Sequence, residues 1–196
     1  CSFFGANFVV LRDACMARYN TDGSLDSNSD ADPLTHFNTD GKYVADLGTT
    51  DDVVYAAALQ PTDGMIVVGG NCGTLTVFAF CLARFTPIGI FDSTFASSGV
   101  ATTVMGTATG SVTEVLVADD GGIVAFGGCF EPTATRFCTA RYTGSGFLDT
   151  GFSGDGKVTT LIGGHSIAGG AALQADGKIV GGGACGLCAG LAVRGS

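Results

Sequence analysis

The stretch AAALQPTDGMIVVGGNC, residues 56–72, occurs three times in this chain with small changes. In each copy a leucine is followed by an Asp-Gly turn, a run of branched apolar residues and a Gly-Gly pair. The other copies are EVLVADDGGIVAFGGC, residues 114–129, and AALQADGKIVGGGAC, residues 171–185, and the three leucines are 57 positions apart. A catalytic motif is normally present once, whereas recurrence at a fixed period indicates a repeat architecture. The chain is therefore predicted to be a repeat protein.

Three further motifs recur in the same order. They are ACMARY (14–19), FCLARF (80–85) and FCTARY (137–142); GSLDS (23–27), IGIFDSTF (88–95) and GFLDTGF (146–152); and GKYVADLG (41–48), GVATTVMG (99–106) and GKVTTLIG (156–163). The arginine–aromatic pairs of the first motif are separated by 66 and then 57 positions. Four motifs in one order at one period define a repeating unit of about 57 residues.

Each unit is predicted to consist of short strands. KYVADL, MIVV and KVTTLI are rich in β-branched and aromatic residues, and turns containing Gly, Asp or Asn bound most such runs. The Ala-rich YAAALQ, residues 55–60, is predicted to be a strand because its repeat partner EVLVADD is strand-like. We therefore expect an all-β fold of about three and a half repeats, built as propeller-like or β-solenoid-like antiparallel blades. The expected single domain, residues 1–196, divides into units 1–71, 72–128, 129–184 and a partial unit 185–196.

The hairpin motifs, together with ARYNTDGSLDS and GFLDTGFSGDGKVTT, resemble the delta-60 repeat, a β-propeller-like repeat of secreted bacterial proteins. The resemblance extends over nearly the whole chain. It implies four-stranded blades and an extracellular or cell-surface location. It implies no catalytic residues, and none are transferred to this sequence. Two features depart from the pattern. The chain holds only about three and a half units, whereas closed propellers usually need about 4 to 8 blades. It also carries cysteines at fixed places in its repeat.

The eight cysteines follow the repeat. In two complete units a cysteine after the Gly-Gly pair is nine positions from a cysteine in the arginine motif. Neighbouring antiparallel strands bring such positions within disulfide range. We predict one disulfide per repeat, bracing a surface loop outside the cell: Cys1–Cys15, Cys72–Cys81, Cys129–Cys138 and Cys185–Cys188.

Two other chemistries compete for the cysteines. CGLC, residues 185–188, has the spacing of a thioredoxin-like redox motif, although the βαβ context of that motif is not visible. The same pair could form half of a zinc site, for which only His36 and His165 could supply imidazole. Structural disulfides are favoured over both because a secreted repeat protein folds in an oxidising compartment.

The loop NTDGSLDSNSDAD, residues 20–32, is a candidate calcium site. Asp22, Asp26, Asp30 and Asp32 offer hard oxygen ligands of the kind that Ca²⁺ prefers. No glutamate closes the loop and no helices flank it, and the matching turns of the other repeats lack these carboxylates. The alternatives are a calcium site and a longer, solvated loop, and no other cofactor is expected.

The remaining sequence argues against catalysis, nucleic-acid binding and a membrane span. GHSIA, residues 164–168, resembles a nucleophile elbow but ends in alanine, and no histidine follows Ser166. The net charge is −9 and no basic stripe is present, so phosphate backbones have no attractive surface. No apolar run approaches the roughly 18 to 20 residues of a spanning helix. The chain is predicted not to be an enzyme.

The strand inventory suggests a function. The Asp-Gly hairpin occurs three times and the arginine strand four times, if GLAVR, residues 190–194, is included. Strands without partners expose edges that recruit another chain. We expect an extracellular structural protein whose copies polymerise head to tail through unpaired terminal strands into a filament. The alternative is a non-catalytic module of a larger adhesin that recognises a glycan or a protein.

Overall fold

The computed structural model of the chain describes residues 2–4, 10–27, 36–74, 77–106 and 109–186. These residues form short strands and two single helical turns. The elements are β1 (Ser2–Phe4), β2 (Val10–Arg12), β3 (Ala14–Ala17), α1 (Asn38–Gly41), β4 (Lys42–Ala45), β5 (Asp51–Leu59), β6 (Ile66–Thr74), β7 (Val77–Phe85), η1 (Phe95–Ser97), β8 (Val100–Thr103), β9 (Thr109–Val117), β10 (Ile123–Phe130), β11 (Thr135–Tyr142), β12 (Lys157–Thr160), β13 (Ser166–Leu173) and β14 (Ile179–Cys185). The predicted all-β fold is confirmed, and the Ala-rich stretch 55–60 lies almost wholly in β5.

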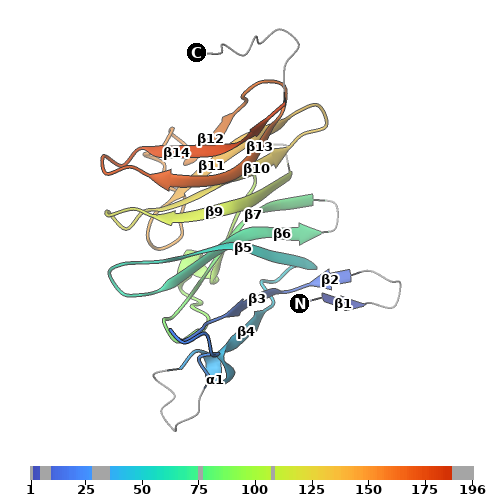
Figure 1. The fold of residues 1–196 in the computed structure, drawn as a ribbon. Helices are drawn as coiled ribbons and strands as arrows, with labels where there is room; N and C mark the ends of the chain where they lie inside the picture. Colours follow the sequence, from blue (N-terminus) through green and yellow to red (C-terminus); the bar gives the residue numbers. More distant parts are fainter. Residues whose placement is uncertain (1, 5–9, 28–35, 75–76, 107–108, 187–196) are drawn as a thin grey trace.

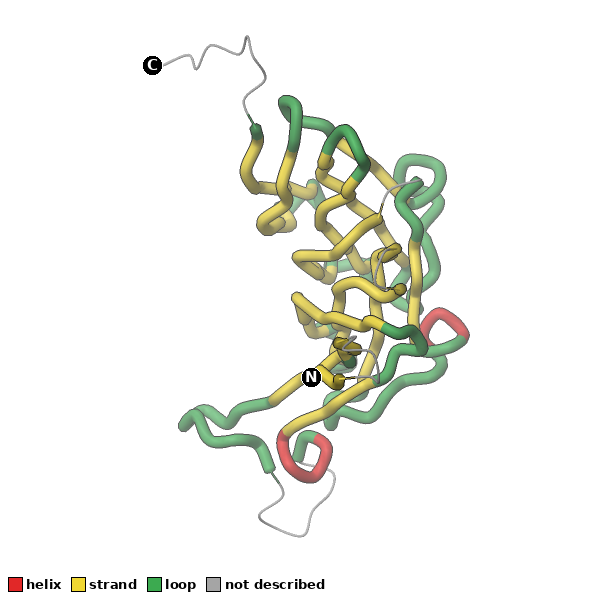
Figure 2. The backbone as a smooth tube through the Cα atoms, turned by 90° about the vertical axis from the view of Figure 1, so that its right-hand side faces the viewer, coloured by secondary structure: helices red, strands yellow, loops and turns green. Residues whose placement is uncertain are grey.

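Two complete antiparallel units, β5–β8 and β9–β12, form the middle of the molecule, and we call them the second and third sheets. The N-terminal pair β3–β4 lies on one side of them and the C-terminal hairpin β13–β14 on the other (Figure 1). The sheets stack in chain order, and the described strands do not close into a ring (Figure 2). Each complete sheet starts at the Asp-Gly hairpin rather than at the cysteine with which the sequence units begin.

The N-terminal strands join the second sheet in a way that the repeat does not predict. β2 pairs with β5 in parallel through Arg12 and Asp51. The guanidinium of Arg12 donates two hydrogen bonds to the carboxylate of Asp51, at 2.6 and 2.5 Å. The Asp51 side chain is fully buried, and its carboxylate raises the pKa of Arg12. This bidentate ion pair therefore supplies the charge compensation that a buried carboxylate requires.

The Asp-Gly turns have one geometry in all three hairpins. In each turn an aspartate carboxylate accepts a hydrogen bond from the backbone N–H two residues later, at 2.9 to 3.2 Å. The aspartates are Asp63, Asp120 and Asp176. The following glycines have φ between 70° and 81°, which other residues rarely adopt. The turn that the sequence predicts is thus fixed by two residues, one supplying an acceptor and the other a left-handed backbone.

The Gly-Gly pair has a packing reason. The pairing of the first two strands of each unit shifts by one residue, and a glycine of the pair sits at this bulge in each case. A Cβ atom added at Gly70, Gly127 or Gly183 would lie 1.8 to 2.0 Å from a backbone carbonyl oxygen of the neighbouring strand. Only glycine permits so close an approach of two backbones.

The apolar core lies between the sheets. One cluster, between the N-terminal pair and the second sheet, includes Ala14, Leu47 and Phe85. A larger cluster, between the second and third sheets, includes Phe80 and Tyr142. Each sheet is therefore stabilised by contact with its neighbours in the stack, as expected when one repeat cannot bury its own apolar faces.

We predict opposite outcomes for two neighbouring glycines of the third sheet. Gly127→Ala should lower the free energy of unfolding by at least about 2 kcal/mol, because its Cβ would fall 2.0 Å from the carbonyl oxygen of Ser111. Gly128→Ala is the matched control and should cost less than about 1 kcal/mol, since its Cβ meets only the half-exposed ring of Phe130, at 3.2 Å. Urea denaturation followed by circular dichroism measures both. Equal losses in the two variants would contradict the bulge explanation.

Candidate functional site: the joint between repeats

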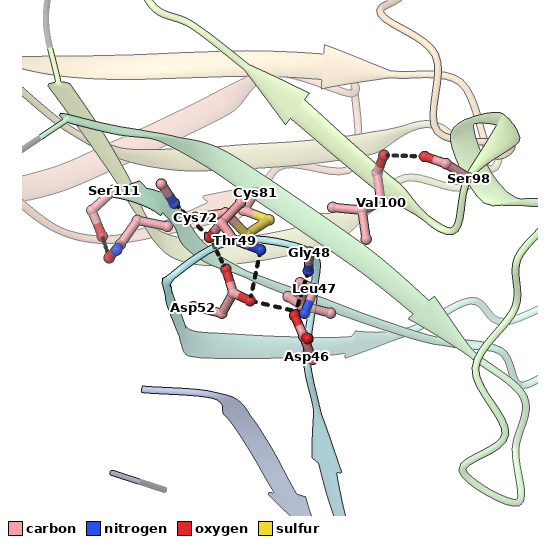
Figure 3. The surroundings of a disulfide bond; sticks show 12 residues. Asp46, Leu47, Gly48, Thr49, Asp52, Cys72, Cys81, Ser98, Val100 and Ser111 are labelled. Carbon is pink, nitrogen blue, oxygen red and sulfur yellow. Dashed lines mark hydrogen bonds between the residues drawn. A yellow bond between two sulfur atoms is a disulfide. The ribbon is translucent and has the colours of Figure 1, made fainter. Parts of the chain in front are cut away.

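The two predicted disulfides of the complete repeats are both present. Cys72 is bonded to Cys81, and Cys129 to Cys138, with Cα–Cα separations of 5.5 and 5.9 Å. All four cysteines are buried in the clusters between sheets. Figure 3 shows the Cys72–Cys81 bond beside the 46–52 turn, which leads from one unit to the next. Each disulfide thus links two neighbouring strands and packs within a joint, the buried interface between two successive sheets. The expectation that it braces a surface loop stays a prediction.

Each arginine of the repeated motif forms an ion pair with an aspartate eight positions later. Arg84 Nε donates to Asp92 Oδ2 at 2.7 Å, and both side chains are largely buried. Arg141 Nε lies 3.0 Å from Asp149 Oδ2, and Arg18 pairs with Asp26. The ion pair joins the third strand of a unit to the loop that follows it, and its recurrence shows that it belongs to the repeat.

Two of these arginines, Arg84 and Arg18, also contact the next unit. Arg84 Nη1 donates to the carbonyl oxygen of Gly144, 2.7 Å away, and its guanidinium lies 5.0 Å from the ring centre of Phe95. Arg18 makes the equivalent contacts one unit earlier, with the carbonyl oxygen of Pro87 and the ring of Phe37. One guanidinium thus neutralises its own aspartate, stacks on an aromatic ring and binds the backbone of the following repeat.

These contacts explain the acidity of the paired carboxylates. Burial is the largest single influence on Asp92 and would raise its pKa, but hydrogen bonds from Thr94 and Arg84 outweigh it and lower the pKa. Against the same opposing effect of burial, hydrogen bonds from Arg18 and His36 lower the pKa of Asp26. A carboxylate with a lowered folded-state pKa stabilises the fold above its unfolded-state pKa of about 4, and this stabilisation is lost as the pH falls through the folded-state value.

A turn glycine and an aromatic residue of each unit complete the contact with the unit before it. A Cβ added at Gly146 would lie 2.7 Å from the ring of Phe95, so this turn rests directly on the ring. The phenol of Tyr142, only 1% exposed, donates to Thr103 Oγ1 at 2.8 Å across the joint. In the preceding joint neither hydroxyl exists, because Phe85 replaces the tyrosine and Ala45 the threonine. The aromatic position and the position facing it therefore both carry a hydroxyl in one joint, and neither does in the other.

The outer side of the third sheet has the same parts, and among the described residues only the two-stranded hairpin β13–β14 lies beside it. A pocket of about 540 Å³ lies there, between β11, β12 and the C-terminal hairpin. Its lining residues repeat the buried side of the preceding joint 57 positions later: Arg141 for Arg84, Phe152 for Phe95, Val158 for Ala101 and Thr160 for Thr103. The pocket is therefore one half of a joint.

The N-terminal pair presents the other half. Tyr19 occupies the position of Tyr142 but is 63% exposed. Beside β3, a groove of about 450 Å³ lies over β5 and β6 and is lined by the exposed Tyr55 and Leu59. In a complete unit, the first two strands would pack in this position.

The C-terminal hairpin supplies two such strands. β14 corresponds to β6 and β10, each of which pairs with strands on both sides, whereas in the described part of the chain β14 pairs with β13 alone. Val180 on β14 is 52% exposed, and its counterparts Val67 and Val124 are fully buried. The hairpin thus has an open edge and an apolar face that match an open third strand and a groove at the other end of the stack (Figure 1).

The structure describes two of the four predicted calcium ligands, Asp22 and Asp26, and each has other partners. Asp22 accepts hydrogen bonds from the amide and hydroxyl of Ser24, at 2.9 and 2.6 Å, and Asp26 holds Arg18 and His36. Asp30 and Asp32 lie outside the described residues. Across the ranges that are described, no three acidic, histidine or cysteine side chains are grouped to hold a metal ion. Calcium binding stays a prediction.

Ser166 of the GHSIA motif closes a turn. Its hydroxyl donates to the carbonyl oxygen of Ile162 and accepts from the amide of the same residue, both at 2.8 Å. Asp52 performs the equivalent task two repeats earlier, where its carboxylate accepts from the amide of Leu47 at 2.8 Å. The side chain that resembles a nucleophile therefore has a structural role in the repeat.

The two remaining disulfide predictions involve residues beyond the described ranges. Cys1 and Cys188, the proposed partners of Cys15 and Cys185, are both outside them. Cys15 and Cys185 are exposed, at opposite ends of the stack. These two bonds stay predictions, as do the zinc and redox alternatives for residues 185–188.

The stacked sheets and their joints define a β-propeller-like repeat protein. A family model described as a domain of unknown function (DUF5122) beta-propeller matches residues 5–28 and 62–95. The match covers much of the Asp-Gly hairpin and the arginine strand, and it supports a propeller-type repeat family. No curated protein matches the chain. None of the described helices is long and apolar enough to cross a bilayer.

Sequence reasoning missed the Arg–Asp pair, although its signal was present. The three arginines are each followed by aspartate at the eighth position, in Asp26, Asp92 and Asp149. The motifs that carry these residues were recognised as separate elements. A fixed spacing between opposite charges in successive repeats would have connected them.

We predict that Arg84→Lys lowers the free energy of unfolding by about 2 kcal/mol. Lysine keeps the charge but cannot bind the Asp92 carboxylate and the Gly144 carbonyl together in the fixed fork of a guanidinium. Arg136→Lys is the control, because its pair with Glu131 is more exposed and should change stability by less than about 0.5 kcal/mol. Urea denaturation measures both, and an equal effect at the two sites would refute a special role for Arg84.

We predict that the phenol of Tyr142 loses its proton only at unusually high pH. Burial raises its pKa to about 12, although the hydrogen bond with Thr103 partly offsets this effect. Because the folded state holds this proton more tightly, the stabilisation is complete below the unfolded-state pKa of about 10 and is lost as the pH rises towards the folded value. A rapid ultraviolet titration of the phenols should show a late component that Tyr142→Phe removes. Tyr55→Phe, which removes an exposed phenol, should leave that component in place; its loss there would contradict the assignment.

Proposed function

We propose that this protein is an extracellular structural protein whose copies assemble head to tail through their terminal strands. The observation that carries the proposal is the complementarity of the two ends. One end presents the first two strands of a unit, β13 and β14, and the other presents the last two, β3 and β4. Together they supply the four strand positions of the second sheet, in the order β13–β14–β3–β4.

Strand addition would satisfy both ends at once. Within the described residues β14 is paired on one side only, and its other edge carries backbone donors and acceptors that a third strand can pair with. The hairpin would also enter the groove over β5 and β6 of the second copy, covering Tyr55 and Leu59. In Figure 1 the two ends lie far apart on one molecule, so they meet between copies. Identical head-to-tail contacts that do not close generate filaments.

Three features support an extracellular location. Two buried disulfides are present, and such bonds persist in oxidising compartments. The chain has a net charge of −9. The motifs resemble the delta-60 repeat of secreted bacterial proteins, and we propose that the chain belongs to this group within the propeller-type repeats.

Assembly is tested by measuring the mass and shape of the particles as a function of protein concentration. The chain, produced in an oxidising compartment, should give a mass by light scattering that rises with concentration, and elongated particles by electron microscopy. Val180→Lys should reduce assembly at least about tenfold, because it places a charge on a face that the joint buries. Val104→Lys is the matched control: Val104 is similarly exposed, and its counterpart in the first repeat, Asp46, is already charged. Monodisperse monomers of the unaltered chain at every concentration would refute the proposal.

A further inference from the structure

The two ends of the stack each present one half of a joint, and their side chains match. This match indicates an occupant for the pocket behind the third sheet. The pocket displays an aromatic ring, a guanidinium and a hydroxyl in the positions that receive a following unit: Phe152, Arg141 and Thr160. In the joint before it, the counterparts of these groups contact three parts of one short segment: a turn glycine, a turn carbonyl and a tyrosine.

The segment 19–23 has this set of groups. Its turn has the same backbone hydrogen bonds as the turn at 143–147, from Asn20 N to Ser24 O at 2.8 Å and from Gly23 N to Asn20 O at 3.0 Å. Gly23 has the left-handed φ of its counterpart Gly146, 86° against 93°. A Cβ added at Gly23 would meet nothing within 4 Å, whereas one added at Gly146 would meet a ring. The turn is thus formed, and the surface that would meet a ring is open.

The aromatic residue fits the socket in polarity. In one buried joint Tyr142 donates to Thr103, and in the other the corresponding positions hold Phe85 and Ala45, which lie in one apolar cluster. Thr160 stands at the position of Thr103 in the open pocket, so it offers the hydroxyl that accepts from a tyrosine in the preceding joint. The first repeat carries Tyr19 at the matching position, largely exposed.

We propose that the pocket lined by Phe152, Arg141 and Thr160 binds the segment 19–23 of a second copy of this chain. Tyr19 donates to Thr160, Arg141 donates to the backbone carbonyl of Thr21, and Gly23 rests on the ring of Phe152. This inference rests on the proposed function, to which it adds the contacts that select the partner. Strand pairing alone accepts many sequences, whereas this socket accepts a tyrosine followed by a glycine turn.

The first experiment blocks the contact without altering the monomer. Gly23→Asn suits a left-handed backbone and has open space in the monomer, but its side chain would collide with the ring of Phe152 in the joint. It should weaken association of copies at least about tenfold. Gly48→Asn is the control, since Gly48 has a φ of 92° and open space in a turn at the other end of β4. It should associate normally.

The second experiment maps the contact. A photoreactive p-benzoylphenylalanine in place of Tyr19 should cross-link to the segment 152–162 of another copy, as identified by mass spectrometry of mixed nitrogen-15-labelled and unlabelled chains. Tyr19→Phe should weaken association, and Thr160→Val should cause no further loss in that background because the two changes remove one shared hydrogen bond.

The outcomes separate the two proposals. If the unaltered chain associates while Gly23→Asn and Gly48→Asn associate equally, assembly stands and this joint is wrong. Cross-links confined to one chain would also overturn the joint, because they would show that the chain covers its own pocket. If the unaltered chain stays monomeric, the proposed function fails first.

Discussion

The fold depends on one constraint: a sheet of this repeat buries its apolar faces only against other copies of the repeat. The four disulfide cysteines, the ring of Phe95 and the phenol of Tyr142 are all buried between sheets. The ion pairs obey the same rule, because Arg84 joins its own loop to the backbone of the next unit. Stability is therefore distributed along the stack as a series of joints.

The sequence was sufficient to predict the elements that are local. The Asp-Gly turns, the strand at 55–60 and the two disulfides follow from residue type and spacing, because each involves neighbouring strands of one unit. The burial of the disulfides was not predictable in this way. Cys72 and Cys129 both follow a glycine pair that resembles a surface turn, and only the stacking of a second sheet covers them.

Contacts between units could not be predicted from the sequence, and the reason is physical. Arg84 binds the carbonyl of Gly144, and a backbone carbonyl has no residue-specific signature. The parallel pairing of Arg12 with Asp51 falls outside the repeat, so no second copy of it could be compared. The pairing of Tyr142 with Thr103 joins residues 39 positions apart, and it becomes meaningful only beside Phe85 and Ala45.

Three of the large exposed apolar side chains have a common explanation in the joint. Leu59, Val180 and Tyr19 are each more than half exposed, and all three lie where the stack presents an incomplete unit. Scattered apolar residues on a surface need no explanation, but Val180 and Tyr19 stand at positions that are buried in the complete repeats. Because a joint between copies would reuse the geometry of a joint within a copy, it needs no separate interface: the residues that stack the sheets would also set the twist of the assembly.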